Sequence, residues 1–481
     1  MMNTFVDSIS AMNSAVNNET TTHNGMKALK STTSSCVDLF FKAGAMRGQD
    51  VRPLFARAFA ENRDHALRIA QWVRDVRSGA GERKLFRDML LEVEKLDDEI
   101  IYQLLKKVPE LGRWDDLLID FKNEDIKNYV YIMIYVALKN GDGLCAKWMP
   151  RKGTIAKKLR ESFGWTPKYY RKRLVELTNV VESPMCKKEW DTIDFNKVPS
   201  LAVSRYKKAF SRHTPNYAKW TAALVSTDPE VKKTVKVNAS AVYPYDVLKG
   251  WEHAGASELQ QITAQWEALP NYMNGASIMA LVDVSGSMTS FSYYQGNPTK
   301  NISPLNIALS LGLYIADKGK GAFKDIVMTF SSSSDLYHLK GSILQKLKTM
   351  NNMSWGGYTN LHAGFDRILS HAIEHAVPES DMPKILLIMS DMQFNGCVTY
   401  NHSALQMMRN KYDDAGYEMP QIVFWNINSH DNVPMSVNTN GVALVSGFSP
   451  SIVKSILEAD MKEFTPTGMM LKTIMNDRYR L

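Results

Sequence analysis

The sequence predicts two folded parts, an α-helical repeat domain followed by a doubly wound α/β domain. Between residues 34 and 272, apolar residues recur every three or four positions in runs that Gly or Pro interrupts, which is typical of short packed helices. Between residues 276 and 481, continuous apolar runs of strand length alternate with helical stretches, which indicates a mainly parallel sheet covered on both faces. A chain of 481 residues is also longer than one ordinary core requires.

Residues 1–33 are predicted to form a mobile, disordered tail. They are rich in Asn, Thr and Ser and poor in large apolar side chains, so they bury too little surface to offset the entropy lost on ordering. The segment also lacks the basic stretch and apolar core of a signal peptide. The most apolar stretch, residues 129–138, is too short to span a bilayer. We therefore expect a soluble, cytoplasmic monomer with no membrane partner.

The helical domain, residues 34–272, is expected to be an array of short helix pairs. Short breaks at glycine or proline separate its periodic runs, as in α-solenoids, although no clean repeat period is present. The runs lie at residues 55–76, 85–96, 99–105, 126–138, 168–181, 201–210 and 258–269.

The α/β domain, residues 276–481, contains six strand candidates. They lie at residues 277–282, 325–330, 335–339, 385–390, 422–427 and 442–446, with helical stretches near 303–317, 342–349, 360–375, 402–414 and 450–458. Sheets of this kind bind ligands at the carboxyl ends of their strands.

The strongest functional signal follows two of these strands. Asp283, Ser285 and Ser287 form a D-x-S-x-S loop directly after the first strand. Thr359 lies in the segment GGYTN at the start of a helix, and Asp391 follows the strand at 385–390. Because these positions lie at the same edge of a parallel sheet, we expect the five side chains to form one site.

Two carboxylates and three hydroxyls form a hard oxygen set. Such a set suits Mg²⁺ best, with Mn²⁺ or Ca²⁺ as alternatives, rather than zinc or copper. It leaves a coordination position for water or for a carboxylate of a protein partner. The alternative is that the two aspartates cap helices and the serines form turns.

The segments DVSGSM, GGYTN and SD, in this order, resemble the metal-ion-dependent adhesion site (MIDAS) of von Willebrand A domains. The resemblance covers roughly residues 276–481. It implies a binding domain, and it assigns the divalent cation to the five residues named above.

The excess positive charge of the chain lies in one central block. Residues 151–250 hold 21 Lys and Arg against 9 Asp and Glu, whereas residues 1–150 hold 21 of each and residues 251–481 hold 16 against 20. A localised basic block is typical of proteins that bind polyanions. The predicted RNA-binding residues are Lys147, Arg151, Lys152, Lys157, Lys158, Arg160, Lys168, Arg171, Lys172, Arg173, Arg205, Lys207, Lys208 and Arg212.

Aromatic residues are interleaved with these cations and can stack on unpaired bases. They are Trp148, Trp165, Tyr169, Tyr170 and Tyr206. Two alternatives remain open, namely that each aromatic belongs to the core and that the cations form a solvated face without a partner.

A second basic segment, RDVRSGAGERKLFR at residues 74–87, contains two glycines. Its backbone N–H groups can approach a phosphate, but no strand precedes it, so it matches no known phosphate-loop pattern. A turn between two helices is the favoured interpretation.

A helical array followed by a von Willebrand A domain resembles the Ro autoantigen family of TROVE-domain proteins. The resemblance covers residues 36–481, and in the helical part it rests on order, length and basic character alone. It implies a ring of HEAT-like repeats that the A domain closes, and it implies binding of small noncoding RNAs and of single-stranded ends of misfolded RNAs, within a ribonucleoprotein.

We therefore expect an RNA-binding protein whose A domain also mediates metal-dependent protein contacts. The alternative is a metal-dependent protein–protein interaction module that binds no RNA. We expect no enzymatic activity, because the sequence contains no HExxH, GxSxG or phosphate-loop motif, and Ser285 belongs to the metal motif rather than to a triad with Asp283 and His362. The four cysteines form no C-x-x-C pair, which excludes a zinc knuckle of that type.

Overall fold

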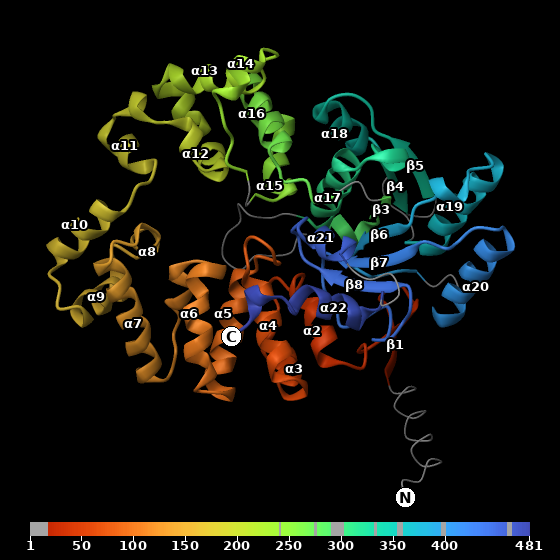
Figure 1. The fold of residues 1–481 in the computed structure, drawn as a ribbon, viewed down its shortest axis with the longest axis horizontal. Coiled ribbons are helices and arrows are strands. Elements are labelled where there is room, and N and C mark those ends of the chain that lie inside the picture. The colour runs from red at the N-terminus through yellow and green to blue at the C-terminus, as the bar shows by residue number, and fades with distance from the viewer. Residues whose placement is uncertain are drawn as a thin grey trace, which may run out of the picture. The chain divides into compact units, whose positions relative to one another are not determined.

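A computed structural model describes residues 18–239, 242–273, 277–289, 303–330, 334–353, 359–395, 401–458 and 464–481. By their contacts the residues fall into two compact units, one formed by Asn271–Arg480 with the chain up to Val73, and one formed by Arg74–Pro270. The first contains the sheet and the second is helical (Figure 1). The predicted fold class, a helical part followed by a doubly wound α/β part, is confirmed.

The sheet of the first unit has six strands in the order β5-β4-β3-β6-β7-β8. Every neighbouring pair is parallel except β4 and β5, which are antiparallel. The strands are β3 (Ile278–Asp283), β4 (Ile326–Phe330), β5 (Ser334–His338), β6 (Ile385–Ser390), β7 (Gln421–Asn426) and β8 (Val442–Ser446). The central strands are buried along their whole length, as the continuous apolar runs require.

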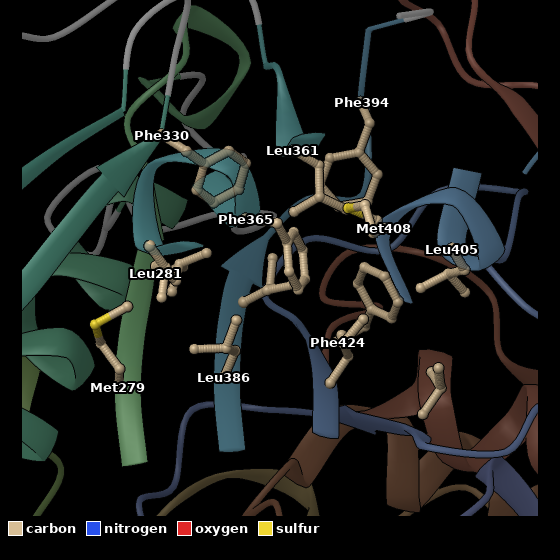
Figure 2. Packing of buried hydrophobic residues seen from close by; sticks show 14 of the residues in the cluster. Met279, Leu281, Phe330, Leu361, Phe365, Leu386, Phe394, Leu405, Met408 and Phe424 are labelled. Carbon is tan, nitrogen blue, oxygen red and sulfur yellow. The ribbon is translucent and has the colours of Figure 1, made fainter. Parts of the chain in front are cut away.

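Alternate side chains of the strands face two helical layers. On one face, Leu281 and Leu386 pack with Phe365 and Met408, which come from α19 (Leu361–Glu374) and α20 (Asn401–Asp414) (Figure 2). On the other face lies α17 (Pro304–Lys318), whose Gly312 approaches β3 so closely that an added Cβ would lie 2.6 Å from a methyl of Val282. The helices α18 (Ile343–Asn351), α21 (Ile452–Leu457) and α22 (Pro466–Ile474) also belong to this unit. This two-sided covering is the doubly wound arrangement.

The N-terminal segment differs from the prediction. Residues 18–33 are ordered rather than part of a disordered tail, because β1 (Glu19–Thr21) and β2 (Lys27–Leu29) pair as an antiparallel hairpin. Residues 1–17 of the predicted tail lie outside the described residues. The hairpin is held by polar contacts to the rest of the α/β unit. Such contacts leave no pattern of apolar residues in the sequence.

The division by contacts also differs from the predicted boundary of the helical domain at residue 34. The helices α2 (Ser35–Ala43), α3 (Arg52–Glu61) and nearly all of α4 (Arg63–Arg74) belong to the α/β unit. The physical reason is the packing of α2 on β8, where Ser446 Oγ donates to Phe40 O at 2.9 Å and accepts from Gly44 N at 3.0 Å. Both contacts join positions about 400 residues apart in the chain.

The second unit consists of short helices, several of which begin at a residue whose side chain caps the helix. For example, α10 (Pro167–Leu177) starts with Thr166 as N-cap and Pro167 in its first turn. The remaining helices are α5 (Arg83–Leu96), α6 (Ile100–Leu111), α7 (Glu124–Lys139), α8 (Gly143–Trp148), α9 (Gly153–Ser162), α11 (Glu182–Lys187), α12 (Ser200–His213), α13 (Pro215–Leu224), α14 (Pro229–Lys233), α15 (Pro244–Leu248) and α16 (Ala256–Glu267). Within the described ranges, no helix has the length and apolar character that crossing a membrane requires.

Candidate functional site

The candidate metal site lies where the order of the strands reverses. From β3 the chain continues to β4 on one side, whereas from β6 it continues to β7 on the other side, and β3 and β6 are parallel neighbours. Asp283 ends β3, and Asp391 follows Ser390 at the end of β6. The carboxyl edge at such a switch point is the usual ligand site of an open α/β sheet.

Asp283 is completely buried and is held by two hydrogen bonds. Its Oδ1 accepts from Ser285 N at 2.9 Å, and its Oδ2 accepts from Ser390 Oγ at 2.5 Å. Burial and the nearby charge of Asp391 raise the pKa of Asp283 well above its usual range, although the hydrogen bonds from Ser390 and Ser285 act in the opposite direction. The buried surroundings of Asp283 therefore disfavour a negative charge on its carboxyl group.

Asp391 is only 1% exposed, and one of its oxygens accepts no hydrogen bond from a described residue. Its Oδ1 accepts from Gln393 N at 3.1 Å, whereas its Oδ2 has no hydrogen-bond donor among the described residues. The Nε2 atom of His430 lies 3.8 Å from this oxygen, and the His430 side chain is 40% exposed. A buried carboxylate oxygen without a donor costs on the order of 1–3 kcal/mol or more, which a bound cation would offset.

The two predicted serines lie on the turn after β3. The Oγ atoms of Ser285 and Ser287 lie 3.1 Å apart, and Ser285 is buried whereas Ser287 is partly exposed. The turn continues into a short 3-10 helix at Gly286–Thr289. Both hydroxyls therefore come from one loop next to Asp283, as the motif predicts.

Thr359 is joined to the Asp391 loop by a residue that sequence reasoning missed. Its N–H donates to Asn395 Oδ1 at 2.5 Å, and its carbonyl oxygen accepts from Asn395 N at 3.0 Å. Thr359 is 1% exposed and precedes α19, of which Asn360 is the N-cap. The glycines and Tyr358 of the GGYTN segment lie outside the described residues.

The donor set at this edge can hold a hard divalent cation. Two buried carboxylates and three hydroxyls are oxygen ligands of the kind that Mg²⁺, Mn²⁺ or Ca²⁺ accept. A cation would account for the buried Oδ2 of Asp391, which accepts no hydrogen bond from a described residue. No three His, Cys, Asp or Glu side chains gather into a metal-binding group anywhere in the described ranges, and this edge itself brings only two carboxylates.

The hairpin at the N-terminus reaches the same loop. Thr22 Oγ1 donates to Phe394 O at 2.6 Å, His23 N donates to Gln393 Oε1 at 2.7 Å, and Asn24 Nδ2 donates to Gln393 O at 2.6 Å. The loop that follows Asp391 is therefore fixed from outside by a segment about 370 residues earlier in the chain. No sequence motif indicates this contact.

His362 has its own partner. Its Nδ1 lies 3.0 Å from Asp366 Oδ2, while the hydroxyl of Ser285 pairs with Ser287. These pairings give no support to a triad of Ser285, Asp283 and His362.

The basic block occupies several helices of the second unit, and most of its cations face solvent. The exposed ones are Lys147, Arg151, Lys152, Lys157, Lys158, Lys168, Arg171, Lys172, Arg205, Lys208 and Arg212. Arg160, Arg173 and Lys207 are partly buried. Two of these have structural partners, because Arg173 donates to Leu138 O at 3.0 Å and Lys207 lies 2.7 Å from Glu258.

The interleaved aromatics divide between core and surface. Tyr170 is buried, and its hydroxyl donates to Pro150 O at 3.0 Å, so it belongs to the core. Tyr169 is 46% exposed and packs edge-on against Trp165, with ring centroids 5.0 Å apart. Tyr206 donates to Glu182 at 2.8 Å.

In a comparison with known proteins, two family models match the chain and meet between residues 275 and 277. A family model described as a domain of unknown function (DUF2828) matches residues 22–93 and 144–275, and a second one (DUF7788) matches residues 277–476. A protein of Acanthamoeba polyphaga mimivirus, "Uncharacterized protein L728", is 28% identical over 512 aligned residues, which cover 94% of this chain and 86% of the viral protein. Among solved structures, the Ro (RSR) protein of Deinococcus radiodurans is similar with a TM-score of 0.39 and 14% identity, over 92% of this chain and 100% of that one.

Proposed function

We propose that the protein binds RNA through the exposed cations of α8, α9, α10 and α12, which are called the basic face below. The observation that carries the proposal is the surplus of exposed positive charge on α8 and α9, which both pack on α10, on α10 itself, and on α12. Such a surface attracts a phosphate backbone and gains free energy by releasing its counterions.

Four cations of the basic face are the strongest candidates. Lys152, Lys158, Lys168 and Arg171 are exposed, and none of them makes an ion pair with any described residue. By contrast, Lys157 and Lys172 have weak exposed pairs at 3.8 Å with glutamates on their own helices. The resemblance of the chain's organisation to Ro-type proteins makes RNA the polyanion to test first.

We further propose that Asp283, Ser285, Ser287, Thr359 and Asp391 hold a divalent cation, with Mg²⁺ the first choice. Ser390 would orient Asp283, Gln393 would orient Asp391, and Asn395 would fix the backbone of Thr359. When bound, the ion would offer a Lewis-acidic position to a carboxylate of a protein partner, as in a MIDAS of von Willebrand A type.

The second candidate function is metal-dependent protein binding without RNA. It is favoured by the assignment of the two features to different compact units, which leaves each able to act alone. Titration of purified protein with single-stranded RNA across a salt series separates the two functions. A steep loss of affinity with salt supports RNA binding, whereas no binding at low salt excludes it and leaves the metal-dependent module.

A further inference from the structure

A cluster of arginines lies around two aspartates at the start of α5. Arg74 Nε and Arg83 Nε donate to opposite oxygens of Asp116, at 2.7 and 2.8 Å. Arg87 Nε shares the second oxygen of Asp116 at 3.0 Å. The arginine cluster is defined as Arg74, Arg83, Arg87 and Arg113 with Asp115 and Asp116.

The more exposed arginines of the cluster contact the second aspartate, Asp115. Arg113 Nε and Nη2 donate to the two oxygens of Asp115 at 3.1 and 3.0 Å, and Arg83 Nη2 also contacts Asp115. Arg87 Nη2 donates to the carbonyl oxygen of Asp115 at 2.6 Å. Because Arg83 shares one carboxylate with Arg87 and the other with Arg113, these three guanidinium groups are close together.

The cluster has two more positive than negative charges. Its four guanidinium groups meet two carboxylates, and none of the four pairs with any other described carboxylate. Arg74 and Asp116 are buried, whereas the side chains of Arg83, Arg87 and Arg113 are 35%, 25% and 30% exposed. The excess charge therefore lies on the solvent side, and burial together with Arg83 lowers the pKa of Arg87.

The exposed arginines have N–H groups that donate to no described residue. A guanidinium group carries five N–H donors, and Arg83, Arg87 and Arg113 use only their Nε and Nη2 atoms on described residues. Their Nη1 atoms have no protein acceptor in that part of the chain. The ring of Trp148 lies 3.6 Å from Arg113 Cζ, and this stacking fixes the plane of that guanidinium group.

The first turn of α5 adds a second, independent preference for an anion. The helix is 14 residues long and begins at Arg83, without a side-chain cap and without an acidic residue in its first turn. The helix dipole and the first N–H groups favour negative charge at this end. Glu82 at the N-cap makes no side-chain capping hydrogen bond, Arg83 follows it, and Lys84 pairs with Asp88 at 2.7 Å. A bound anion would interact favourably both with the helix dipole and with the neighbouring guanidinium groups.

We propose that the arginine cluster binds a phosphate group, through Arg83, Arg87 and Arg113 and the N-terminus of α5. Guanidinium groups bind phosphate oxygens in bidentate fashion, and an excess of two positive charges matches a phosphate dianion. The phosphate is either the end of a nucleic-acid strand or a free phosphate. This site lies outside the basic face and does not depend on RNA binding there.

The competing explanation is that the cluster only ties Arg74, α5 and the turn at Trp114–Leu117 together. The two explanations differ for the substitution Asp115→Asn. If the cluster is purely structural, this substitution only destabilises the protein. If the cluster binds phosphate, it removes a competing carboxylate and strengthens phosphate binding.

The test is a calorimetric and ³¹P NMR titration of the full chain with inorganic phosphate. We expect saturable binding that Arg83→Gln weakens about tenfold or more. Asp115→Asn should bind more tightly than wild type, and Lys95→Gln, which removes an exposed cation from the other end of α5, should bind within about twofold of wild type.

Two further arms identify the source of the phosphate. An oligoribonucleotide with a 5′-phosphate that binds more tightly than its 5′-hydroxyl counterpart, only when Arg83 is present, assigns the site to a strand end. Binding of inorganic phosphate without such a difference assigns it to a free phosphate, and this outcome stands even if the basic face binds no RNA. The proposal is overturned if wild type shows no saturable phosphate binding, or if Arg83→Gln and Asp115→Asn bind phosphate as wild type does.

Discussion

The hydroxyl of Ser390 donates to Asp283 Oδ2 across 2.5 Å and so joins the ends of the two central strands. The register of the sheet creates this pair, because Val282 lies opposite Met389 and the next residues along are Asp283 and Ser390. The same hydroxyl accepts from Met392 N at 3.0 Å, which ties the turn after Asp391 to the pair. Ser390 therefore connects the carboxylate of Asp283 to the turn that follows Asp391, although it is not one of the five predicted ligands.

Replacing Ser390 with alanine should weaken metal binding about tenfold, because the residues that orient metal ligands typically contribute that much. Calorimetric titration with Mn²⁺ measures the effect. Ser310→Ala is the matched control, because Ser310 is also buried and bonds only to a carbonyl of its own helix. Equal affinities of the two variants would argue against the role of Ser390.

Asp283→Asn should stabilise the metal-free protein at neutral pH. The pKa of Asp283 is raised in the folded state by burial and by Asp391, so between about pH 4 and that raised pKa the folded state binds more protons than the unfolded state. The free energy of unfolding of wild type therefore falls as pH rises through this window, and the variant lacks this loss. Each kcal/mol recovered should raise Tm by roughly 2–4 °C.

Thermal unfolding between pH 4 and 8, with and without Mg²⁺, tests this expectation. Mg²⁺ should raise the Tm of wild type and leave that of Asp283→Asn unchanged. Asp381→Asn, at an exposed position of the same unit, should behave as wild type. Parallel pH profiles of wild type and Asp283→Asn would show that the buried carboxyl carries no such penalty.

The sequence predicted the ligand positions but not their supports. Asp283 and Asp391 were predictable because each follows a continuous apolar strand and parallel strands bring such ends together. Ser390, Gln393 and Asn395 were not, because their contacts depend on sheet register and on loop geometry. Arg173 likewise carries a charge that the sequence assigns to RNA, whereas the structure shows it capping α7 at Leu138.

Thr22→Val should destabilise the α/β unit by about 1–3 kcal/mol, because it leaves two backbone groups without a partner. The Thr22 hydroxyl donates to Phe394 O and accepts from Met26 N at 2.9 Å. Thr20→Val is the control, since Thr20 lies in the same hairpin and its side chain makes no hydrogen bond with a described residue. Chemical denaturation of both variants measures the free energy of unfolding. A similar decrease in the two variants would contradict the anchoring of the hairpin through Thr22.

Gly44→Ala should destabilise the same unit by about 1–3 kcal/mol through overpacking. A Cβ at Gly44 would lie 2.7 Å from the backbone of Ser446, and backbone atoms have little room to move. Gly255→Ala meets nothing within 4 Å and provides the control. A Gly44→Ala protein as stable as this control would argue against packing of α2 on β8.

The fold class followed from periodicity, whereas the assignment of its N-terminal part did not. Periodic apolar residues identify α2, α3 and α4 as helices, but periodicity does not say which unit covers their apolar sides. The Asn- and Thr-rich composition suggested disorder at residues 18–33, yet Thr22 and Asn24 find carbonyl partners in a loop far along the chain.

The most direct test of RNA binding compares two variants that each lose four positive charges. One replaces Lys152, Lys158, Lys168 and Arg171 with glutamine, and the other replaces Lys95, Lys197, Lys232 and Lys233, which are exposed cations of the same unit that pair with acidic residues. Affinity for a single-stranded RNA is measured across a salt series. We predict that the slope of log affinity against log salt concentration is smaller in magnitude by about 3 in the first variant, at about 0.7 per phosphate contact. The second variant should keep the wild-type slope. Equal slopes for the two variants would show that net charge alone, and not the basic face, governs binding.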